Sequence, residues 1–205
     1  MESRLNLLAA AAAQTVATLE ELKAQTRVKH AKEDGVLLAC LEAAVDWAQE
    51  FTDRELRIGG KYALWLSAFP RDGTTIVRLP KPPCVSVDFV RYTDSNGDAQ
   101  VLAAGTDYVT SLPTGPFAMP GRVAPAYAQR WPLTRAQMDA VKIEFTAGYV
   151  AQTNPLPVAA KQAVLILAAE MFANRTEAVI GTISSPVQVT AERLLYPLRV
   201  FGTMV

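Results

Sequence analysis

Hydrophobic spacing predicts an amphipathic helix in the first third of the chain and a helix that is apolar all round near its end. In the first third, apolar residues recur at intervals of four and three, the spacing of the buried side of a helix: Leu37, Leu41, Ala44, Ala48 and Phe51. Cys40 and Trp47 widen this apolar side, and Glu42, Asp46 and Glu50 lie on the other. Glu33 and Asp34 suit the positive end of the helix dipole at its start.

A shorter helix is predicted immediately upstream. Thr18 and Glu21 form the T-x-x-E pattern of a capping box, which opens a helix over "LEELKAQTRV". Because a capping box inside one continuous helix would serve no purpose, residues 5–17 are interpreted as a separate alanine-rich arm of undetermined conformation.

The segment "KQAVLILAAEMFANR" has no polar side chain between Ala163 and Ala169. A helix that is apolar all round must be covered on every side by a core, a membrane or other protein. Lys161 and Glu170 bracket a run far shorter than the roughly 20 residues that a membrane span needs. The predicted core residues of the two long helices are Leu37, Leu41, Trp47, Phe51, Leu165, Leu167 and Phe172.

The middle of the chain has a different pattern. Short segments rich in valine, threonine and aromatic residues alternate with Gly, Pro and Asn-Gly, which is typical of antiparallel strands. "DSNGD" predicts a hairpin with a tight primed turn, in which Asn and Gly both take positive φ angles. The fold class predicted is α+β, mainly an α-helical bundle with a small inserted antiparallel β subdomain. The predicted divisions are 1–17 (arm), 18–55 (bundle), 56–150 (β-rich insertion) and 151–205 (bundle and tail).

Composition narrows the possible functions. The 20 basic and 20 acidic residues cancel, which argues against a dedicated nucleic-acid binder. Cys40 and Cys84 stand in unlike contexts and are expected to be free thiols, as in a protein made in a reducing cytoplasm. Glu2 spoils the basic start of a signal peptide, so no cleavage is expected.

No pattern of catalytic or metal-binding residues is recognisable. His30, the single histidine, lies in a polar segment without a nucleophile pattern beside it. In "DSNGD" the calcium-loop positions that require Gly and Glu hold Ala99 and Gly105. The acidic trio is interpreted as a solvated or inter-subunit helix face. Six basic residues are interpreted as solvated sheet-edge residues: Arg54, Arg57, Lys61, Arg71, Arg78 and Lys81. Catalytic, metal and cofactor sites are therefore all expected to be absent.

Several segments in order resemble the head–tail connector, or adaptor, proteins of long-tailed bacteriophages and gene transfer agents. They run from "TLEELKAQTRV" and "AAVDWAQEFTDREL" through "IVRLPKPPCVSVDFVRYTDSNGDAQVL" and "GRVAPAYAQRWP" to "PLPVAAKQAVLILAAEMFANRTEAVIG" and "LLYPLRV". The alanine-rich arm departs from the family pattern. The resemblance implies a non-enzymatic virion protein that forms a ring, expected to be a dodecamer, below the portal. Such a ring extends the DNA channel without sequence-specific binding and offers an attachment surface to stopper, tail-completion or tail proteins.

Two expectations follow from this resemblance. The helix after Pro157 is expected to be covered partly by its own bundle and partly by neighbouring subunits. In the tail, where Pro197 breaks the last helix, five residues are expected either to dock on the portal or a neighbouring subunit, or to fold back on the bundle: Leu195, Tyr196, Leu198, Val200 and Phe201. A stopper or tail-completion protein of the neck is the alternative function, and a small hydrolase with an unrecognised site is a more distant one.

Overall fold

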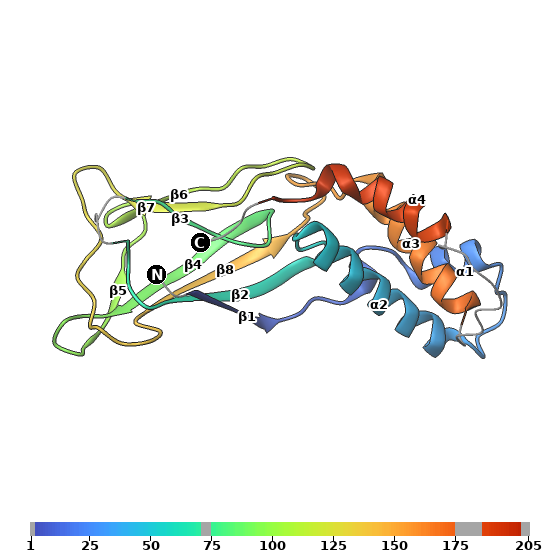
Figure 1. The fold of residues 1–205 in the computed structure, drawn as a ribbon, viewed down its shortest axis with the longest axis horizontal. Helices are drawn as coiled ribbons and strands as arrows, with labels where there is room; N and C mark the ends of the chain where they lie inside the picture. The colour runs from blue at the N-terminus through green and yellow to red at the C-terminus, as the bar shows by residue number, and fades with distance from the viewer. Residues whose placement is uncertain (1–2, 71–74, 175–185, 202–205) are drawn as a thin grey trace.

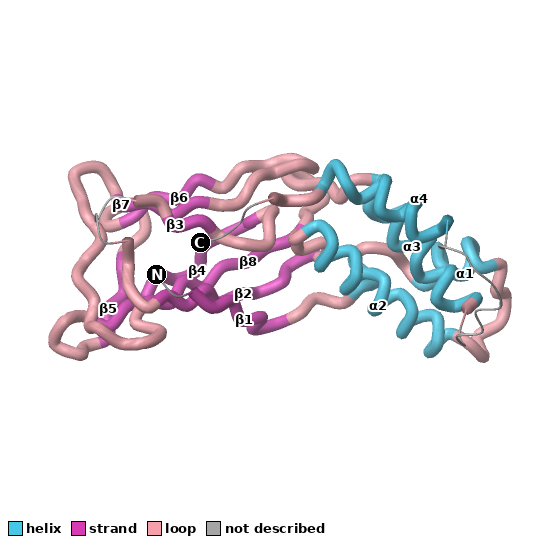
Figure 2. Tube along the Cα trace, viewed as in Figure 1, coloured by secondary structure: helices cyan, strands magenta, loops and turns pink. Residues whose placement is uncertain are grey.

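A computed structural model describes residues 3–70, 75–174 and 186–201. The helices gather at one end of an elongated molecule and the strands at the other (Figures 1 and 2). The prediction of a mixed α+β fold is confirmed. The prediction that it is mainly a helical bundle is wrong, since strands are about as common as helices. The short β segments of the sequence join into larger sheets than their individual lengths indicate.

The described residues form four α-helices: α1 (Leu19–Thr26), α2 (Asp34–Thr52), α3 (Val158–Ala173) and α4 (Pro186–Leu195). Two 3-10 turns, η1 (Ala13–Thr15) and η2 (Tyr196–Leu198), precede α1 and follow α4. The capping box before α1 is confirmed: the Glu21 amide donates to the Thr18 hydroxyl (3.2 Å), and the Thr18 amide donates to the Glu21 carboxylate (2.9 Å).

Helix α3 is covered mainly by its own chain. It packs against α1, α2 and α4, and Ala163, Val164, Leu165, Leu167 and Ala168 are all buried. The expected cover by its own bundle is therefore confirmed, and α1 and α4 add to what α2 supplies. Cover by neighbouring subunits stays a prediction. Of the other predicted core residues, Leu37 and Leu41 are fully buried, and Trp47, Phe51 and Phe172 are partly buried against the same cluster.

The strands form two antiparallel sheets. The five-stranded sheet has the order β1-β2-β8-β4-β5, and the three-stranded sheet has the order β3-β7-β6. Their bounds are β1 Ser3–Ala9, β2 Ile58–Leu66, β3 Val77–Arg78, β4 Cys84–Thr93, β5 Ala99–Leu102, β6 Tyr108–Ser111, β7 Arg122–Pro125 and β8 Val141–Gly148. The N-terminal arm is thus partly a strand: β1 pairs with β2 at the edge of the larger sheet, with Leu5 opposite Leu64.

The two sheets enclose a second hydrophobic core. Tyr62, Leu64, Ile143 and Phe145 of the larger sheet are buried together with Val123 of β7. The opposite face of the larger sheet carries the alternate residues of the same strands, as the two-residue period of a strand requires. Lys61 and Phe89 on this face are exposed, so the face is left uncovered.

The hairpin at "DSNGD" joins β4 to β5, as predicted. Its turn is not of the primed type, however, because Gly97 alone takes a positive φ (101°) in residues 94–98. The Asp94 carboxylate instead accepts hydrogen bonds from the amides of Asn96, Gly97 and Asp98 (2.9–3.1 Å). These bonds keep Asn96 out of the left-handed region, and the turn closes around Asp94.

Candidate docking surfaces

The described residues assemble no catalytic constellation. The side chain of His30 is 57% exposed, with Glu33 as its nearest acidic partner at 3.8 Å. Cys84 is buried, which raises the pKa of its thiol to about 12 and leaves it unreactive. In residues 3–70, 75–174 and 186–201, no His, Cys, Asp and Glu side chains group as a metal site. Over the same ranges, no helix combines the length and hydropathy that a bilayer crossing demands.

A buried polar cluster joins the helices to the larger sheet, and the sequence interpretation missed it. Arg54 and Arg57, expected to be solvated, are only 3% and 6% exposed. Arg57 binds the carboxylates of Asp46 (2.6 Å) and Glu42 (3.1 Å) on α2. The acidic trio therefore shares a helix face, as predicted, but two of its members hold a buried arginine rather than facing only solvent.

Of the other basic residues in that interpretation, Lys61 and Arg78 are exposed. Lys81 is half-buried and pairs with Asp53 (2.8 Å). Arg71 lies outside the described residues. The sequence signal that could have found the buried pair is the alternation of charges in "TDRELR", directly between a helix end and a strand start.

Glu55 lies in the same cluster. Burial raises the pKa of its carboxyl group, although hydrogen bonds from the Tyr62 hydroxyl and the Arg57 amide act in the opposite direction. The pKa of Tyr62 is also raised, first by burial and then by its bond to Glu55. Gly60 makes room for this carboxylate, since a Cβ there would come within 2.9 Å of a Glu55 oxygen. These contacts connect α2 to the start of β2, and we call Glu55, Arg57 and Tyr62 with their partners on α2 the joint.

Arg54 holds the C-terminal tail against this joint. Its Nε atom donates to the Leu198 carbonyl (2.5 Å), and its Nη1 atom donates to the Ala118 carbonyl (2.7 Å). The Val200 amide donates to the Thr52 carbonyl at the end of α2 (2.9 Å). The segment after η2 therefore runs along the junction between helices and strands.

The five predicted docking residues of the tail divide into two groups. Leu195 and Leu198 are at most 1% exposed and belong to the core of their own bundle. Tyr196 and Phe201 are 60% and 66% exposed, with Val200 half-buried between them in sequence. Folding back onto the bundle accounts for the first group, and docking stays a prediction for the second.

The loop at Ala118 adds two exposed apolar residues next to the tail. Phe117 and Met119 are both 57% exposed on either side of the carbonyl that Arg54 binds. Because one guanidinium group binds both Ala118 and Leu198, the loop and the tail lie side by side. We call Phe117, Met119, Tyr196 and Phe201 the tail surface.

A groove lies on the uncovered face of the larger sheet, at the ends of the strands nearest the helices. It is lined by Leu8, Lys61, Asp88, Phe89, Glu144 and Thr146, together with the chain at Tyr62 and Phe145. The strand register shifts at Leu8 and at Asp88, and such bulges re-aim side chains. Leu8 and Phe89 are 49% and 43% exposed. We call the first six of these lining residues the sheet groove.

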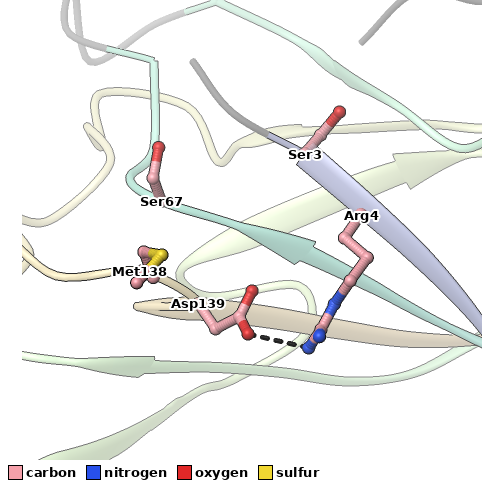
Figure 3. A pocket seen from close by; sticks show the side chains of 5 residues that line it. All are labelled: Ser3, Arg4, Ser67, Met138 and Asp139. Atoms are coloured by element: carbon pink, nitrogen blue, oxygen red, sulfur yellow. Dashed lines mark hydrogen bonds and ion pairs between the residues drawn. The ribbon is translucent and has the colours of Figure 1, made fainter.

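A second pocket lies at the end of the sheet far from the helices. Figure 3 shows Arg4 reaching Asp139 across it, at 2.7 Å, with Ser3, Ser67 and Met138 around them. Both charged side chains are more than 40% exposed. This pocket holds an exposed ion pair with no activated nucleophile, so it gives no reason to assign a reaction.

Part of the chain matches a known protein family. Residues 16–93, which run from the end of η1 to the end of β4, match the family model of the phage gp6-like head-tail connector proteins. No curated protein matches the chain significantly.

Solved structures match almost the whole chain. A chain from the virion of a native gene transfer agent (GTA) particle is 27% identical, with a TM-score of 0.71. A chain from the neck of an empty GTA particle, computed with C6 symmetry, is 25% identical with a TM-score of 0.70. A chain from the neck of a native GTA particle, computed with C12 symmetry, is also 25% identical, with a TM-score of 0.66. Each match covers 98% of this chain and 97% of the other.

The family match lies on the helices and strands that build the junction between the two ends of the molecule. The structural matches extend the likeness over the helical end and both sheets, and two of them are to chains of a particle neck. The resemblance to the head–tail connector proteins of phages and gene transfer agents is therefore confirmed: residues 16–93 match that family, and almost the whole chain is similar in fold to chains of GTA particles.

Proposed function

We propose that the chain forms a ring, expected to be a dodecamer, in the neck directly below the portal, and that it acts as an adaptor rather than an enzyme. The observation that carries this proposal is the match, over 98% of the chain, to neck proteins in particles computed with C6 and C12 symmetry. A match of this extent includes both the helical end and the sheets. It therefore supports the same role in the neck for this chain as for the matched chains.

The ring would extend the DNA channel. A channel through which DNA slides needs few phosphate contacts, because each one adds salt-sensitive affinity. The balance of 20 basic and 20 acidic residues is compatible with this role. The described residues include two buried arginines, Arg54 and Arg57, which are committed to the junction and are not available to bind phosphate.

The exposed part of the tail supports a docking role. Tyr196 and Phe201 contact one another edge to face, with ring centroids 6.1 Å apart, and they remain largely exposed while Arg54 fixes the backbone between them. Aromatic residues held in place beforehand are effective at interfaces because little conformational entropy is lost on binding. Their partner is the portal or a neighbouring subunit.

Mass photometry of the purified protein, alone and mixed with the portal protein of the same particle, tests the proposal. Complexes of ring size on the portal are expected for an adaptor. Persistent monomers in both samples would contradict the adaptor role and favour a stopper or tail-completion protein, which would bind a different neck component.

A further inference from the structure

A closed ring needs two different surfaces on each subunit. In a cyclic assembly with more than two members, contacts are head-to-tail, so that one patch of a subunit meets another patch of its neighbour. The two surfaces must also lie on opposite sides of the subunit and at a similar level along the ring axis. The tail surface and the sheet groove meet these conditions for a subunit whose long axis runs along the ring axis.

The two surfaces lie on opposite sides of the molecule. The loop of Phe117 and Met119 connects β6 to β7, which belong to the smaller sheet. This sheet covers the inner face of the larger one, where Tyr62 and Phe145 are buried. The sheet groove is on the other face, because Lys61 and Glu144 alternate with Tyr62 and Phe145 along their strands.

The two surfaces also lie at the same level along the molecule. Lys61 is near the start of β2, which follows α2, and Thr146 is near the end of β8, which precedes α3. The tail surface is fixed to the end of α2 through the bond between Val200 and Thr52. Both are therefore beside the junction of helices and strands, which lies near the middle of the long axis in Figure 1.

Within the described residues, Asp88 in the sheet groove and Arg199 beside the tail surface each lack an ion-pair partner, as does Lys61 in the groove. The Asp88 carboxylate accepts hydrogen bonds from the hydroxyls of Ser86 (2.9 Å) and Thr146 (3.3 Å), and within the described ranges no basic side chain pairs with it. Arg199, beside the tail surface, lies over the rings of Phe51 (5.4 Å) and Phe201 (5.2 Å). No carboxylate in the described part of the chain pairs with it.

We propose that the tail surface of one subunit docks in the sheet groove of the next, with Arg199 facing Asp88 across the contact. The occupant of the groove is thus a second copy of this chain. The exposed apolar residues of the tail surface cover Leu8 and Phe89, and the unpaired charges of the two sides meet. This inference rests on the proposed ring and names the contact that closes it.

Charge reversal on each side tests this contact. Asp88→Arg and Arg199→Asp are prepared separately, with Asp98→Arg at the far hairpin as a matched control. The concentration of each variant is varied under the conditions in which the wild-type protein assembles, with the portal protein present. Mass photometry gives the protein concentration at which half of it is assembled. Each single variant is expected to raise this concentration about fivefold or more, since a favourable pair becomes a like-charge pair at every contact.

Mixing the two variants in equal amounts gives the sharper result. In an even-numbered ring of alternating variants, the unchanged Arg199 of one subunit meets the unchanged Asp88 of the next. At the following contact the two substituted side chains meet, and they again carry opposite charges. Assembly should therefore return close to the wild-type value. The Asp98→Arg control should assemble as the wild type does, and thermal melting of each variant shows whether it is folded.

The possible outcomes separate the contact from the ring itself. If the wild type forms rings but single variants assemble normally, or the mixture assembles no better than they do, the contact is wrong and the ring stands. If the wild type forms no ring, the proposed function fails and the contact with it. Should Arg199→Asp melt below the control, Leu8→Asp replaces it: this change in the groove leaves the tail untouched and must also raise the half-assembly concentration.

Discussion

Replacing Arg54 with methionine should weaken the whole protein and release its tail. The guanidinium group of this 3%-exposed residue donates to the carbonyls of Leu198 and Ala118. A hydrogen bond from a charged group contributes about 1.5–3 kcal/mol, and the desolvation of the guanidinium offsets part of the sum. We expect Arg54→Met to lower the free energy of unfolding by about 3 kcal/mol.

For a chain of this size such a loss lowers the melting temperature by roughly 6–12 °C. Urea unfolding gives the free energy, and hydrogen exchange of the Val200 amide gives the state of the tail, because this amide is held by the Thr52 carbonyl. We expect its protection to fall much more than that of α3.

Arg122→Met is the matched control, since Arg122 is exposed on β7 and surface changes usually stay within about 0.5 kcal/mol. The reasoning would be refuted if Arg54→Met unfolded like this control and kept the Val200 amide protected.

Three further predictions concern the cores and the joint. Leu167→Asp places a carboxylate on α3 where the leucine is 4% exposed; we expect a loss of more than about 4 kcal/mol, whereas Val158→Asp, at an 82% exposed site, should unfold like the wild type in urea. Gly148→Ala should cost at least about 3 kcal/mol, because φ is 124° and the new Cβ would lie 2.0 Å from the Arg57 carbonyl oxygen. Glu55→Gln should change the pH dependence of stability. The raised pKa of Glu55 favours its protonated form in the folded state, so the stabilisation is present below the unfolded pKa and is lost as pH rises through the folded value.

Each of these has a result that would contradict it. A normal, cooperative melt of Leu167→Asp would show that α3 is not enclosed by its own bundle. Gly115→Ala, with a φ of 108° but open space around it, should lower the free energy of unfolding less than Gly148→Ala. Equal losses would show that steric overlap with the Arg57 carbonyl does not contribute. For Glu55→Gln, the unfolding free energy of the variant minus that of the wild type should increase from about pH 4 to about pH 8, and a constant difference would show that Glu55 is not perturbed.

Local sequence patterns are sufficient to predict the short-range elements of the fold. The apolar spacing of Leu37 and Leu41 is sufficient to predict α2, and the pairing of Thr18 with Glu21 fixes the start of α1, because both depend on residues within a few positions of one another. The Asn-Gly segment likewise predicts a hairpin. The order of these motifs along the chain is similar to their order in head–tail connector proteins.

Which side chains are buried, and which residues cover them, depends on contacts between segments that are distant in the sequence. The residues around Arg54 in the sequence do not indicate which groups accept its hydrogen bonds. The acceptors are the carbonyls of Leu198 and Ala118, which lie 144 and 64 residues away. The alanine-rich arm has no strand signal of its own, yet it forms β1 because the free edge of β2 can pair with it. Helix α3 packs against α1, α2 and α4, which only the arrangement of distant segments could show. Burial and pairing depend on contacts between distant parts of the chain, and local patterns do not encode these.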